Sequence, residues 1–164
     1  MNPLIILSFV VALPVLLALL FRVSGVFLFV SAVSGYLLMR YFGDDANLVL
    51  GMTLHGESTQ MIAQFILLLF PVVVSLLVLK NTLPKAKILL HFPLLVGVGM
   101  MLAVFGLGVL GSEAQNQIIN NQYGAMLNSS QDLIIGATAS MALLIMWFTY
   151  RHKSDKKSKH KRHA

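Results

Sequence analysis

The side chains that could carry chemistry are few, and four of them share one loop. His55 and Glu57 follow Asp44 and Asp45 with no basic residue between them. Imidazole and carboxylate groups gathered on a loop could form an oxygen-rich site for a divalent cation. Their spacing matches no specific ligand pattern, so we interpret them as a solvated acidic loop and expect no metal. A whole apolar segment separates His91 from this loop, so His91 cannot join it within one subunit.

Other reactive arrangements are missing from the sequence. Ser, His and Asp never occur together at a usable spacing, and no pair of carboxylates or glycine-rich phosphate loop is present. Gly97-Val98-Gly99 is not a dinucleotide motif, because no strand precedes it. The chain contains no cysteine, which excludes a thiolate nucleophile and a disulfide framework. We therefore expect no catalytic residue, no cofactor and a non-enzymatic role.

The composition indicates what surrounds the chain. Of 164 residues, 57% are hydrophobic and only 11% are charged, whereas soluble domains carry about 25% charged residues. The mean hydropathy is +0.82. So little charge cannot cover a surface that faces water, but lipid can cover apolar side chains at no cost. The sequence therefore predicts an integral membrane protein.

Five apolar stretches set the predicted fold. About 20 apolar residues of helix are needed to cross roughly 30 Å of hydrocarbon, and helices satisfy their backbone polar groups internally. The stretches do not alternate in polarity as barrel strands do. We predict an all-α bundle of five transmembrane helices within one domain, 1–150, at 3–21, 23–42, 61–79, 88–110 and 133–150.

Charge alternates between the loops. Arg22 separates the first two helices as a tight hairpin, since a single long helix would place this charge at its midpoint. The loop of 43–60 holds only acidic charges, and so does the loop of 111–132. The loop between the third and fourth helices and the tail are basic. By the positive-inside rule we expect the N-terminus outside and the C-terminus in the cytoplasm of a bacterial inner membrane.

Basic residues at the cytoplasmic border are the predicted topology anchors. They are Arg22, Lys80, Lys85, Lys87, Arg151, Lys153, Lys156, Lys157, Lys159, Lys161 and Arg162. Arg40 is the exception, and it lies within reach of an i,i+4 pair with Asp44. The tail, 151–164, is expected to be disordered and to attract anionic lipid head groups. Because no aromatic residue lies between the charges of the tail, we expect no specific binding of nucleic acid.

Small residues recur at helical spacing in three segments. Such stripes let helices approach closely in a membrane, either within the chain or against a partner helix or a second copy. The candidate packing residues are Gly99, Ala103 and Gly106, Ser31 and Gly35, and Gly136 and Ser140.

The loop of 111–132 also has helical periodicity. Ala114, Ile118, Ile119, Tyr123, Met126 and Leu127 would share one face. We predict a short amphipathic helix lying on the outer membrane surface.

The layout of residues 1–130 resembles the colicin V production protein family of bacterial inner-membrane proteins. An early hairpin breaks at Arg22 with Gly25 close behind, a polar loop leads into Met61-Ile-Ala-Gln-Phe-Ile-Leu67, and a basic linker precedes a glycine-rich helix. Where family members carry an Asp-Arg pair, this chain has His91-Phe92-Pro93, and its fifth helix and tail are additional. The resemblance implies a role in toxin production or export or in the envelope.

The expected role is that of a scaffold or accessory subunit of a membrane assembly. The chain offers wide apolar faces and small-residue stripes but few reactive groups. The alternative is an oligomeric channel or transporter for an ion or small solute, with its pore between subunits.

Overall fold

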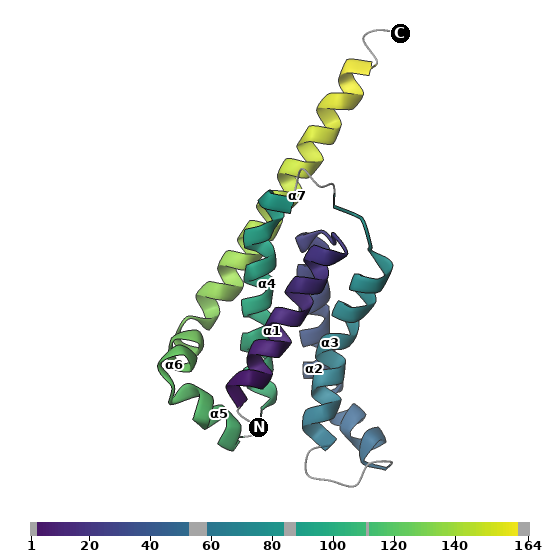
Figure 1. The fold of residues 1–164 in the computed structure, drawn as a ribbon. Helices are drawn as coiled ribbons and strands as arrows, with labels where there is room; N and C mark the ends of the chain where they lie inside the picture. Colours follow the sequence, from purple (N-terminus) through teal and green to yellow (C-terminus); the bar gives the residue numbers. More distant parts are fainter. Residues whose placement is uncertain (1–2, 53–58, 84–87, 111, 161–164) are drawn as a thin grey trace.

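The computed structural model describes residues 3–52, 59–83, 88–110 and 112–160, and some side chains in its helices lie outside this description. Every regular element in the described ranges is a helix (Figure 1). They are α1 (Pro3–Leu20), α2 (Gly25–Gly51), α3 (Thr59–Val78), α4 (Ile88–Val109), α5 (Ser112–Ile119), α6 (Gln122–Ser129) and α7 (Gln131–His160).

Four helices in the described part are long and apolar enough to cross a membrane. Their candidate spans are Gly25–Val49, Thr59–Val78, His91–Val109 and Gln131–Thr149. They correspond to the second to fifth predicted helices, so the all-α fold is confirmed and four of the predicted spans have the length and hydropathy that a membrane crossing needs. The first predicted span corresponds to α1, several of whose side chains are outside the described set. The total of five spans therefore stays a prediction.

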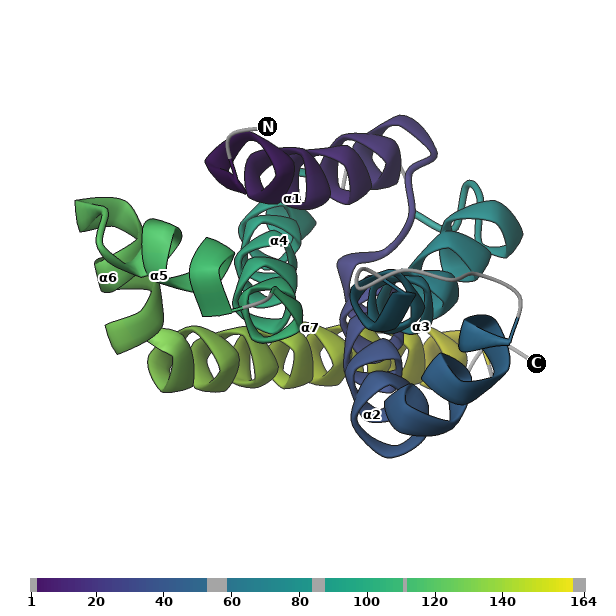
Figure 2. The same ribbon diagram turned by 90° about the horizontal axis from the view of Figure 1, so that it is seen from below.

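Helix α4 lies at the centre of the bundle, as Figure 2 shows along its axis. Two-thirds of its apolar span, 67%, is buried inside the protein, against 17% for the span of α7. Leu94, Leu95, Val98 and Leu102 of α4 are completely buried. They join residues of α1, α2, α3 and α7 in one hydrophobic core. Lipid-facing side chains cannot drive helices together, so close contact with this central helix must hold the bundle.

Helix α2 is longer than its sequence indicates. The predicted end at residue 42 is wrong, because the helix continues through Asp44 and Asp45 to Gly51. Gly43 is buried against α3, and a Cβ atom there would lie 3.4 Å from the Gln64 side chain. An already formed helix gains one hydrogen bond per added residue. The Gly-Asp-Asp sequence therefore marks the end of the apolar stretch and not the end of the helix.

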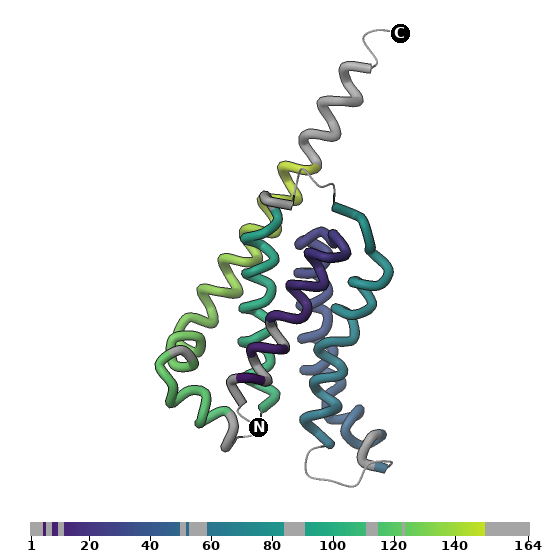
Figure 3. The backbone as a smooth tube through the Cα atoms, viewed as in Figure 1, coloured from purple at the N-terminus to yellow at the C-terminus, as the bar shows by residue number. Residues whose placement is uncertain are grey.

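At the end of the bundle that is predicted to be basic, the α1–α2 junction is hydrogen-bonded to the segment that follows α3. In Figures 1 and 3 the α1–α2 junction, the end of α3 and the start of α4 lie at one end, and the α2–α3 and α4–α5 connections lie at the other. Asn81 N–H donates to the Phe21 carbonyl over 2.8 Å, and Leu83 N–H donates to the Arg22 carbonyl over 2.9 Å. The Lys80 ammonium lies 4.9 Å from the centre of the Phe21 ring. Arg22 and Lys80 thus share one end of the bundle.

The segment after α4 forms two helices. The prediction of a single amphipathic helix is wrong in this respect, because α5 and α6 are separated at Asn120 and Asn121. Asn121 has an extended backbone, with φ −85° and ψ 142°. Asparagine is a weak helix former, which favours a break here. The apolar residues keep their helical spacing on both sides of the break, so the spacing alone could not show that the helix is interrupted. Ile118 is completely buried and packs with Leu107 of α4 and with Leu110, which follows α4, so α5 is docked on the bundle.

The final helix also exceeds its predicted length. We expected it to end at residue 150 and to be followed by a disordered tail, but α7 carries helical backbone to His160. The stretch 151–160 contains no glycine or proline. Lysine and arginine are good helix formers, and extending an existing helix avoids the cost of nucleation. Repulsion between these basic residues does not outweigh those two effects.

Candidate functional site

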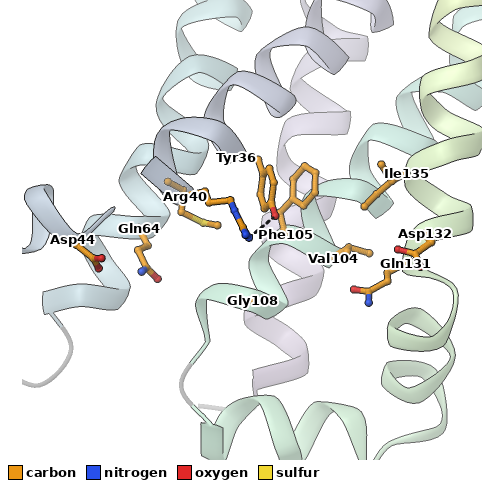
Figure 4. Close-up of a pocket in the computed structure, with 11 residues that line it drawn as sticks. Tyr36, Arg40, Asp44, Gln64, Val104, Phe105, Gly108, Gln131, Asp132 and Ile135 are labelled. Atoms are coloured by element: carbon orange, nitrogen blue, oxygen red, sulfur yellow. Dashed lines mark hydrogen bonds between the residues drawn. The ribbon is translucent and has the colours of Figure 1, made fainter. Parts of the chain in front are cut away.

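A cavity of about 430 Å³ lies between α2, α3, α4 and α7, toward the end of the bundle opposite Arg22 and Lys80 (Figure 4). Its walls combine apolar side chains with charged and amide groups. The lining residues are Tyr36, Met39, Arg40, Asp44, Gln64, Val104, Phe105, Gly108, Gln131, Asp132 and Ile135. Four helices remote in sequence therefore bring polar groups together beside the apolar core.

Arg40 is held by aromatic residues on one side of this cavity. Its Nη1 atom donates to the Tyr36 hydroxyl over 3.5 Å, one helical turn back along α2. The Tyr36 ring stacks on Phe105 of α4, with ring centroids 4.2 Å apart and planes inclined by 20°. Through Tyr36, Arg40 is therefore connected to the central helix by one long hydrogen bond. A guanidinium has five N–H donors, so most of them are available to a bound group.

The polar groups lie on both sides of Arg40. In Figure 4 Asp44 and Gln64 are on one side, and Gln131 and Asp132 are on the other. Gln131 and Asp132 open α7, where the positive end of the helix dipole favours a negative side chain. On α4, Gly108 faces open space, and a Cβ atom there would have no neighbour within 4 Å. The cavity therefore offers one cationic donor, two carboxylates and two amides around free volume.

The structure gives Arg40 a hydrogen bond to Tyr36. The i,i+4 pair with Asp44 that the sequence places within reach of Arg40 stays a prediction. Sequence reasoning noted Arg40 as the exception among the basic residues, but it did not connect Arg40 with Gln64 of the next helix. A charge inside an apolar helix, with a glutamine at the matching depth of the next helix, was the signal available.

The predicted packing residue Gly35 lies where α2 and α3 approach closely. A Cβ atom at Gly35 would overlap the carbonyl oxygen of Leu68 and lie 3.0 Å from its carbonyl carbon. Ser31, one turn earlier, shares a hydrogen bond with Ser75 of α3 and donates to the Phe27 carbonyl. This small-residue stripe is therefore used inside the chain.

The other two stripes have different surroundings. Gly99, Ala103 and Gly106 are buried in the central helix. Gly136 and Ser140 are exposed on α7, and a Cβ atom at Gly136 would have no neighbour within 4 Å. The close approach of α7 to α4 occurs at Gly97, where a Cβ atom would lie 2.8 Å from Thr138 Oγ1. Sequence reasoning missed this contact because Gly97 has no small residue four positions away.

Several candidate residues fall outside the described part. They include His55 and Glu57 of the acidic loop, and among the anchors Lys85, Lys87, Lys161 and Arg162. Only the backbone is described for Arg151, Lys153, Lys156, Lys157 and Lys159. His91 is buried near the start of α4. Among the residues that are described, no three His, Asp or Glu side chains are grouped so that they could hold a metal ion.

Comparison with known proteins gives no relative: no family model, no curated protein and no solved structure matches the chain.

Proposed function

We propose that this protein is a non-enzymatic scaffold or accessory subunit of an assembly in a bacterial inner membrane. The outward face of α7 carries the proposal. Its exposed residues include both small side chains, at Gly136, Ala137 and Ser140, and large ones, at Leu144 and Trp147. The small residues would let a partner helix come close, and the large ones would border the contact.

Two of the small-residue stripes differ in what covers them, and this difference supports the proposal. Ser31 and Gly35 are covered by α3, whereas Gly136 and Ser140 have no cover from the described chain. Small side chains leave a groove on a helix, and this groove gives no packing advantage where it faces only lipid. It gains dispersion contacts when another helix fills the groove. This supports docking of a partner helix or a second copy along α7.

The proposed orientation has the N-terminus outside and the C-terminus in the cytoplasm. The end that holds Arg22 and Lys80 would face the cytoplasm, because short basic loops remain there. The basic end of α7 would then meet anionic head groups. The resemblance in layout to the colicin V production protein family supports placing the assembly in toxin production or export or in the cell envelope.

The absence of native cysteine allows a direct test of the α7 face. We expect Ser140→Cys, carrying a thiol-linked photocrosslinker in native membranes, to give one discrete adduct with a partner polypeptide or a second copy. Ser34→Cys is the matched control, since Ser34 is also an exposed serine within a membrane helix. Adding Gly136→Leu should abolish the adduct because it fills the groove.

Identical crosslinking from Ser34→Cys and Ser140→Cys, or an adduct that survives Gly136→Leu, would contradict docking on this face. Flux of an ion or small solute through the purified protein in liposomes would instead support the alternative role as an oligomeric channel or transporter.

A further inference from the structure

We propose that the cavity beside Arg40 binds a zwitterionic phosphate–ammonium head group, supplied by a phospholipid of the outer leaflet. This proposal does not require a partner on the docking face of α7, although Asp132 of the cavity lies one turn before Gly136 of that face. The proposal rests on the charges around the cavity, on the apolar part of the cavity wall and on the depth of Arg40 in the membrane.

The anionic half of the ligand would bind Arg40. Tyr36, stacked on Phe105, receives one guanidinium donor. The remaining N–H groups can form the paired hydrogen bonds that a planar guanidinium makes with phosphate oxygens. Gln64 and Gln131 on opposite walls add amide donors. The planar fork of a guanidinium matches a phosphate better than the single ammonium of a lysine does.

The cationic half would lie near a carboxylate. The cavity is lined by one arginine and by Asp44 and Asp132, so its charged side chains sum to −1. A ligand with only negative charge would be attracted by Arg40 but repelled by two carboxylates. A ligand with only positive charge would meet the guanidinium. A phosphate with an attached ammonium satisfies both signs, which is the reason for choosing a zwitterion.

The rest of the wall suits a lipid. Val104, Phe105 and Ile135 present apolar surface, and the volume of about 430 Å³ lies within the range of roughly 300–1,000 Å³ typical of ligand sites. Gly108 leaves space that any larger residue would fill. Arg40 and Asp132 are exposed, so the site is open to the surroundings.

The depth of Arg40 matches a head group. Helix α2 begins at Gly25, and at 1.5 Å per residue Arg40 lies about 22 Å and Asp44 about 28 Å further along it. The hydrocarbon core is about 30 Å thick. With Gly25 at the cytoplasmic border, Asp44 lies near the opposite border and the Arg40 backbone about 8 Å below it. A long arginine side chain can extend from that depth toward the phospholipid phosphates.

The test uses the full chain in detergent and native mass spectrometry with added lipid. We expect phosphatidylethanolamine to be retained in preference to phosphatidylglycerol, which lacks the ammonium. Arg40→Gln and Asp132→Asn should each lower retention about tenfold, as expected for the loss of a charge-assisted hydrogen bond. Arg22→Gln, at the other end of the bundle, is the control and should bind as the parent protein does.

Water-soluble glycerophosphoethanolamine separates the two sources of this head group. If it fails to displace the lipid at millimolar concentration, the phospholipid is the ligand. Displacement at micromolar concentration would overturn the lipid source and assign a soluble ligand of the same chemistry. Equal retention of phosphatidylglycerol, or unchanged retention by both folded cavity variants, would overturn the site itself. Circular dichroism identifies the folded variants, and two substitutions on different helices guard against one failing to fold.

Discussion

Gly35→Ala is expected to destabilise the protein, although alanine is the better helix former. The substitution gains about 1 kcal/mol of intrinsic helix propensity. The new methyl group, however, would overlap the carbonyl oxygen of Leu68, and a backbone atom cannot rotate away as a side chain can. Forcing such overlap typically costs about 1–3 kcal/mol. We expect a net loss of stability, measured as a lower midpoint of thermal unfolding in detergent.

Gly108→Ala is the matched control for this substitution. Gly108 is also inside a membrane helix, but a Cβ atom there would have no neighbour within 4 Å. Because Gly108 is the penultimate residue of α4, the gain in propensity is smaller than in a helix interior, and the unfolding midpoint should be equal or slightly higher. If both variants changed stability by the same amount, the close approach of α2 and α3 at Gly35 would be contradicted.

Leu102→Ala should cause a second large loss of stability. Leu102 is completely buried in the central helix, and removing such a side chain leaves a cavity that costs about 2–5 kcal/mol. Part of that cost is the transfer of the side chain out of water, and this part is small in a membrane because lipid is as apolar as leucine. The part that comes from lost dispersion contacts remains. We therefore expect about 2 kcal/mol or more, measured by reversible denaturation in mixed micelles.

The exposed Leu77 of α3 provides the comparison. Its side chain is 56% exposed, so Leu77→Ala should change the unfolding free energy by less than about 0.5 kcal/mol. Equal losses from Leu102→Ala and Leu77→Ala would mean that α4 is not the centre of the bundle.

Apolar length made most of the helices predictable. The predicted segment 61–79 compares with Thr59–Val78 for α3, and 88–110 compares with Ile88–Val109 for α4. A membrane helix must hold enough apolar residues to cross the hydrocarbon, so its span is set by local composition. The ends of α2 and α7 were not predictable in this way, because polar residues can continue a helix beyond the lipid.

The cavity could not be predicted because its residues come from four helices. Sequence spacing reports neighbours on one helix, and it placed Asp44 within reach of Arg40. Tyr36 is equally one turn away from Arg40 and accepts its hydrogen bond, while the stacking of Tyr36 on Phe105 joins two helices and is not visible in the spacing. Likewise, small-residue spacing identified Gly35 but could not tell that Gly136 faces outward and that Gly97 meets Thr138. Those outcomes depend on how the helices rotate against one another.

Labelling of single cysteines tests most directly that these helices cross the membrane with the Arg22 and Lys80 end in the cytoplasm. Thr82→Cys at that end and Gln60→Cys at the other are both exposed positions. In intact spheroplasts an impermeant maleimide should label Gln60→Cys, and it should label Thr82→Cys only after the membrane is permeabilised. Labelling of both without permeabilisation, or the reverse pattern, would contradict the membrane-spanning arrangement or its orientation.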